Sequence, residues 1–65
     1  MTDFLIADHG SIVSILPVSA AARDWLDANI VAEPWQWVDG AVAVDPRCAR
    51  DIVAELIDAG FALSP

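Results

Sequence analysis

A chain of 65 residues, 57% of them hydrophobic, predicts one small folded domain, residues 1–65, and excludes a disordered acidic tail. Ten acidic residues against three arginines and no lysine give a net charge of −7. This charge opposes direct binding to nucleic acid or to membranes and favours a protein partner with a basic surface. The single cysteine excludes an internal disulfide. The first residues, with Asp3 and no basic residue, predict neither a signal peptide nor a transmembrane helix, so we expect a cytoplasmic protein.

The N-terminal part predicts a β-hairpin. Two apolar runs of strand length, DFLIAD and SIVSILP, flank His9 and Gly10, which suit a two-residue turn. The second run is apolar at both odd and even positions. We therefore expect the second face of the sheet to be partly covered by a partner or by self-association.

The next segment, SAAARDWLDANI, predicts a helix. Ser19 is a suitable N-cap, because its hydroxyl can accept a hydrogen bond from a free N–H of the first turn. Ala22, Trp25 and Leu26 share the apolar side. Pro34 then interrupts the helical pattern.

A second hairpin and a second helix follow. The segments WQWV and AVAV surround Asp39 and Gly40, a strong signal for a two-residue turn. Asp45 as N-cap, Pro46 at the first helical position and Gly60 after the last turn delimit the helix. Its core side is predicted to comprise Ala49, Ile52, Val53, Leu56 and Ile57.

The element order β-β-α-β-β-α predicts an α+β fold with an antiparallel sheet of four strands, or of five if the final FALS adds an edge strand, and two helices on one face. Trp35 and Trp37 are expected on the same side of the third strand. Two indoles are a large volume for one thin core, so one of them is a candidate exposed interface anchor.

Catalytic residue types are present but not in a catalytic pattern. The stretch DHGS holds Asp8, His9 and Ser11, the types of a hydrolase triad, at the tip of the predicted hairpin, where their side chains diverge. A small enzyme or redox protein centred on Cys48 and His9 is an alternative, since a thiol in the first turn of a helix can have a lowered pKa. A small buried cysteine is the commoner case. We predict no enzyme, no cofactor and no metal site.

The second predicted helix carries a row of carboxylates. Asp51, Glu55 and Asp58 are spaced by four and three residues, which stacks them in one stripe, and Arg47 can relieve only the N-terminal end. A basic groove built to accept a row of phosphates would supply the missing cations. We therefore expect a partner-binding surface, extended by the acids of the first helix and of the segment after it. Its candidate residues are Asp51, Glu55, Asp58, Asp24, Asp27 and Glu33.

Two long stretches, DFLIADHGSIVSILPVSAAARDWL and AVAVDPRCARDIVAELIDAGF, resemble a family of small uncharacterised proteins from bacteria, phages and mobile elements. The shared motifs are turns, caps and core positions, so the resemblance implies a fold and supplies no catalytic residue. In size and acidity the chain is also similar to phage anti-CRISPR proteins that act on type I-C surveillance complexes. Several of these are acidic decoys on the surface that reads the PAM and grips DNA.

That resemblance implies a non-enzymatic, monomeric inhibitor in the bacterial cytoplasm, which binds the type I-C complex and blocks target DNA with a DNA-mimicking surface. The alternative is a generic protein-interaction module of a phage or mobile element, whose acidity serves only solubility.

Overall fold

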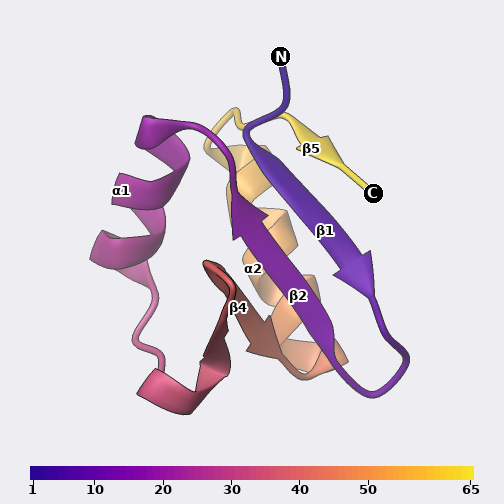
Figure 1. Cartoon of the computed structure of the whole chain (residues 1–65). Coiled ribbons are helices and arrows are strands. Elements are labelled where there is room, and N and C mark those ends of the chain that lie inside the picture. Colours follow the sequence, from indigo (N-terminus) through magenta and orange to yellow (C-terminus); the bar gives the residue numbers. More distant parts are fainter.

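The computed structural model describes residues 1–65 and confirms the α+β class, with two helices packed against one five-stranded sheet (Figure 1). In chain order the elements are β1 (Phe4–Asp8), β2 (Val13–Pro17), α1 (Ala20–Asn29), the short 3-10 helix η1 (Pro34–Gln36), β3 (Trp37–Val38), β4 (Ala41–Val44), α2 (Pro46–Asp58) and β5 (Leu63–Ser64). The order of strands across the sheet is β3-β4-β2-β1-β5.

The sheet is mixed, whereas the sequence predicted an antiparallel one. The pairs β1–β2, β2–β4 and β3–β4 are antiparallel, but the edge strand β5 pairs with β1 in parallel. The connection through α2 explains the difference. Strand β4 runs in the same direction as β1, since both are antiparallel to β2, and a helical crossover returns the chain in its original direction.

The two hairpins differ in their loops. Asp39 and Gly40 both have positive φ, 51° and 83°, and join β3 to β4 as the predicted two-residue turn. The predicted two-residue turn at His9 and Gly10 is wrong, because the last pair of that hairpin is Asp8 with Val13, which leaves a four-residue loop. The Asp8 carboxylate accepts a hydrogen bond from the Gly10 N–H at 2.8 Å. The His9 N–H donates to the Ile12 carbonyl at 2.8 Å, so the loop closes around Gly10 and Ser11 instead of around His9 and Gly10.

The predicted helix caps are confirmed. Ser19 Oγ accepts from the Ala22 N–H at 3.1 Å and begins α1. Asp45 begins α2 and accepts from two N–H groups of its first turn, at 2.8 and 3.0 Å. At the other end Gly60 takes a φ of 90°, and its N–H and that of Phe61 donate to carbonyls of the last turn, as in a Schellman motif.

The segment around the two tryptophans folds differently from the prediction. Only Trp37 belongs to β3, whereas Trp35 lies in η1, so the two indoles do not share one side of a strand. Pro34 at the first position of η1 favours this turn, and the Gln36 side chain holds it against β4 through a 3.2 Å hydrogen bond to the Ala43 carbonyl. Trp35 is 76% exposed, so it is the more exposed of the two candidate anchors.

One hydrophobic core lies between the sheet and the helices. Its buried members are Phe4, Val13, Ile15, Ala22, Leu26, Val42, Val44, Ala49, Ile52 and Leu56. Phe61 packs edge-on against Phe4 with ring centroids 5.2 Å apart, and Trp25 packs edge-on against Phe61. Ile57, which was predicted to be a core residue, is 63% exposed. It lies at the margin of the apolar side of α2, where the sheet does not reach it.

Candidate functional site

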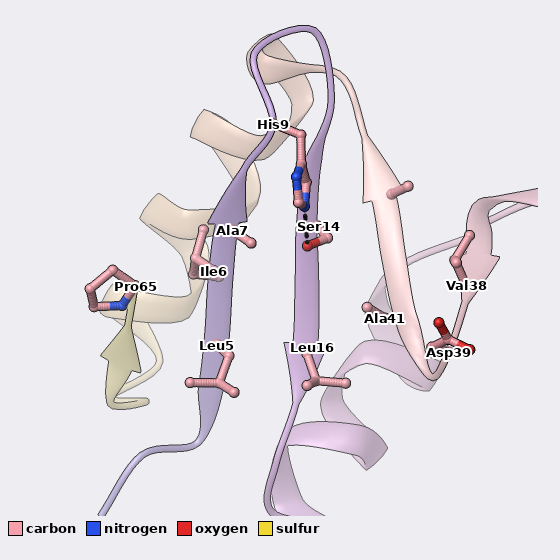
Figure 2. Close-up of a pocket in the computed structure, with 11 residues that line it drawn as sticks. Leu5, Ile6, Ala7, His9, Ser14, Leu16, Val38, Asp39, Ala41 and Pro65 are labelled. Atoms are coloured by element: carbon pink, nitrogen blue, oxygen red, sulfur yellow. Dashed lines mark hydrogen bonds between the residues drawn. The ribbon is translucent and has the colours of Figure 1, made fainter.

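The molecule has two unlike sides. The helices cover the sheet face that carries the core, and the other face is not covered by any element (Figure 2). We call this second face the open face; its residues are Leu5, Ala7, Ser14, Leu16, Val38, Ala41 and Ala43. It is hollowed over a volume of about 450 Å³. Leu5 is 40% and Val38 56% exposed, so large apolar side chains meet solvent here.

Polar groups stand at the two ends of the open face. At the β1–β2 end the His9 ring lies over the strands, with Nε2 3.4 Å from Ser14 Oγ (Figure 2). At the opposite end Asp39 lies in the β3–β4 turn. The face between them is apolar apart from Ser14, so it is suited to contact with another apolar surface rather than to chemistry.

The acidic stripe, Asp51, Glu55 and Asp58, lies on the outer side of α2. All three side chains are exposed. At 100° per residue Asp51 and Asp58 lie roughly 130–150° from the centre of the buried side of the helix, whereas Glu55 lies at its flank, roughly 90° away. No basic residue lies in the last turn of α2, which leaves the C-terminal half of the stripe without a neutralising partner on its own helix.

The other three predicted partner-binding residues are also exposed. Asp24 and Asp27 lie on α1, and Glu33 precedes η1. Both helices pack against β2 and touch each other sparsely, so the acids of α1 and α2 share one side of the molecule without forming a continuous row. The segment after α1 comes closest to the stripe at Asp51, where both line a hollow of about 300 Å³.

The remaining acidic residues serve the fold. Asp8 and Asp45 accept hydrogen bonds from nearby N–H groups, and Asp39 takes the left-handed turn conformation. Asp3 accepts from Ser19 Oγ at 2.8 Å and from the Ala62 N–H at 3.0 Å. Of the six acids predicted from the sequence as partner-binding, Asp24, Asp27, Asp51, Glu55 and Asp58 have no such structural role. Glu33 has one, because it is the N-cap residue of η1 and its N–H donates to Gln36 Oε1 at 2.8 Å.

Asp3 has a structural role that the sequence analysis missed. Its carboxylate joins the N-cap of α1 to Ala62, the residue directly before β5 and far away in the chain. The hydrogen bond from the Ala62 N–H, followed by that from Ser19, lowers the pKa of the Asp3 carboxyl. No local pattern signals partners at this sequence distance.

Cys48 does not have the properties expected from its position. It is exposed rather than buried. Its Sγ donates to Asp45 Oδ2 at 3.5 Å, and this hydrogen bond, together with the charge of Asp45, raises the pKa of the thiol instead of lowering it. The pKa of Asp45 is lowered, mainly by the hydrogen bond from the Cys48 N–H and then by the one from the Cys48 thiol.

The residues of DHGS do not form a triad. Asp8 holds the loop backbone through Gly10, and His9 contacts Ser14 rather than Ser11. Across the chain no three His, Cys, Asp or Glu side chains are arranged to hold a metal ion. Neither helix has the length and apolarity that a membrane crossing requires.

Comparison of the chain with models of protein families, with curated proteins and with solved structures finds no match.

Proposed function

We propose that this chain is a non-enzymatic inhibitor that binds a basic, DNA-binding protein surface through its helix side and so competes with DNA. The observation that carries the proposal is that some acidic residues have structural roles and others have none. Those with structural roles lie in turns and caps, whereas Asp51, Glu55 and Asp58 stand exposed on one side of α2, at a cost to the helix. A groove of arginines and lysines would remove that cost.

The resemblance to anti-CRISPR proteins makes the type I-C surveillance complex the first target to test. Such a complex grips duplex DNA with basic residues, and each carboxylate of the stripe would replace a phosphate there. Charge complementarity of this kind speeds the encounter and weakens with salt.

The experiment is a competition assay. Purified type I-C complex, labelled target DNA and this protein are mixed at about 50 mM and at about 300 mM salt, and bound DNA is measured. We expect the protein to displace DNA at low salt and to lose affinity steeply at high salt. No displacement at either salt concentration excludes this complex as the target.

Two single substitutions distinguish the effect of where a charge lies from the effect of the total charge on inhibition. Glu55→Gln removes one carboxylate of the stripe. Asp8→Asn removes one carboxylate at the β1–β2 loop, and asparagine can still accept the hydrogen bond from the Gly10 N–H. Both variants have a net charge of −6, against −7 for the native chain. Loss of one partner of a desolvated charge pair costs about 2–5 kcal/mol, so Glu55→Gln should weaken inhibition about thirtyfold or more. Asp8→Asn should match the native protein.

A second candidate is the generic interaction module, whose acidity serves solubility. The open face favours it, because that face exposes apolar side chains such as Leu5 and Val38 around a hollow of about 450 Å³. If neutralising the whole stripe leaves competition unchanged, the stripe is a solvated helix side and this second candidate replaces the first.

A further inference from the structure

The open face is an exposed apolar sheet surface without a partner in the chain. Leu5 and Leu16 pair across β1 and β2 on this face, and Val38 pairs with Ala41 at its other edge. Of the strand residues on this face only Ser14 is polar, although a sheet face in contact with water normally carries mostly polar residues. A covering surface would remove this apolar area from water.

The distribution of charge points to what can cover it. The stripe and the α1 acids lie on the helix side, so two copies that met through that side would bring carboxylates against carboxylates. Among the ten acidic residues Asp39 alone lines the hollow of the open face. For a chain with a net charge of −7, this face is where a second copy can approach with least repulsion.

The two ends of the face complement each other. His9 and Asp39, the two ionisable side chains that line it, lie at opposite ends of the strands and carry opposite charge when the histidine is protonated (Figure 2). In a twofold interface every contact between a residue of one copy and a residue of the other occurs a second time with the two copies exchanged. A twofold axis that exchanges the ends therefore forms the His9–Asp39 contact twice.

We propose that the open face is the interface of a homodimer, in which His9 of each copy lies beside Asp39 of the second copy. The two sheets pack face to face, about 10 Å apart, and the helices lie on the two outer sides. This arrangement differs from the monomer expected from the sequence. It does not depend on the proposed function, and it leaves both acidic helix sides accessible.

The small area of the open face limits the affinity of the dimer. Its extents are 27 × 21 × 18 Å. One flat face of these dimensions buries on the order of 500 Å² per copy, toward the low end of specific interfaces. The dimer should therefore dissociate on dilution, with a dissociation constant on the order of micromolar or weaker.

Sedimentation equilibrium tests the association. At concentrations from about 5 μM to about 500 μM the average mass should rise from 6.9 kDa toward twice that value. Leu5→Glu and Val38→Glu place a charge at either edge of the open face and should each prevent the rise. Ile57→Glu is the matched control, since it adds the same charge to an exposed apolar residue on α2 and should leave the rise unchanged. Circular dichroism confirms that each variant is folded.

A charge exchange tests the arrangement. His9→Asp puts like charges together at each end of the interface and should weaken the dimer about threefold or more. The double variant with His9→Asp and Asp39→His should restore most of the loss, because histidine tolerates the left-handed conformation of the turn.

The outcomes are distinct. A monomer at every concentration overturns the proposal, and the face must then be covered by a different molecule. Association that survives in the Leu5 and Val38 variants, or that is lost in the Ile57 variant, places the interface elsewhere and also overturns it. A third outcome is association that the Leu5 and Val38 variants prevent but that the double variant, His9→Asp with Asp39→His, does not restore. This outcome overturns the pairing of His9 with Asp39.

Discussion

Removing the charges of the acidic stripe should stabilise the protein rather than unfold it. The perturbation is the triple variant Asp51→Asn, Glu55→Gln and Asp58→Asn. These substitutions keep the size and nearly keep the helix propensity of each side chain. All three side chains are exposed and none belongs to the hydrophobic core, so little packing is lost.

The magnitude follows from the positions along α2. The stripe contains one like-charge pair at four residues and one at three, each worth about 0.2–0.5 kcal/mol of repulsion. Asp58 is the last residue of the helix, where the helix dipole disfavours an anion by about 0.3–1 kcal/mol. An exposed attraction between Arg47 and Asp51 would offset about 0.3–0.5 kcal/mol of this gain. The free energy of unfolding should therefore rise by about 1 kcal/mol.

The assay is thermal unfolding followed by circular dichroism at low and at high salt. For a domain of this size about 1 kcal/mol shifts the Tm by about 4–8 °C, so we expect the Tm to rise by about 4–8 °C at low salt. The gain should shrink at high salt, because screening weakens the repulsion in the native protein. A Tm that falls by several degrees would refute the reasoning, since it would mean that the stripe makes native contacts within the chain.

Three further perturbations test the fold. Leu26→Ala should lower the free energy of unfolding by about 2–5 kcal/mol in urea titrations, because Leu26 is fully buried. Asp3→Asn should lower the Tm at neutral pH. Since hydrogen bonding lowers the pKa of Asp3 from its ordinary 3.8, its contribution exists above that value, and the difference from the native protein should vanish as the pH falls below it. Iodoacetamide should alkylate the exposed Cys48 slowly at pH 7, and Asp45→Asn, which keeps the cap, should accelerate the reaction.

Local chemistry made much of this fold predictable. The caps at Ser19 and Asp45, the stop at Gly60 and the turn at Asp39 and Gly40 each depend on a few neighbouring residues, so they can be identified from the sequence. The exposure of the five candidate acids on α1 and α2 could likewise be predicted, because an exposed helix side follows from the spacing of the apolar residues on the other side. Their role in binding a partner stays a prediction.

Tertiary structure decided what local patterns leave open. The parallel β5, the role of Asp3 and the exposure of Ile57 depend on where the chain returns in space, which no short pattern specifies. Cys48 has a raised thiol pKa because its side chain turns toward the Asp45 carboxylate rather than benefiting from the helix dipole.

The sequence by itself determined that both faces of the sheet are rich in apolar residues, since alternation along a strand assigns its residues to two sides. Only the folded arrangement decided which face the helices cover. A chain of this length has two helices, enough to cover one sheet face, so the other stays open, with His9 and Asp39 at its two ends.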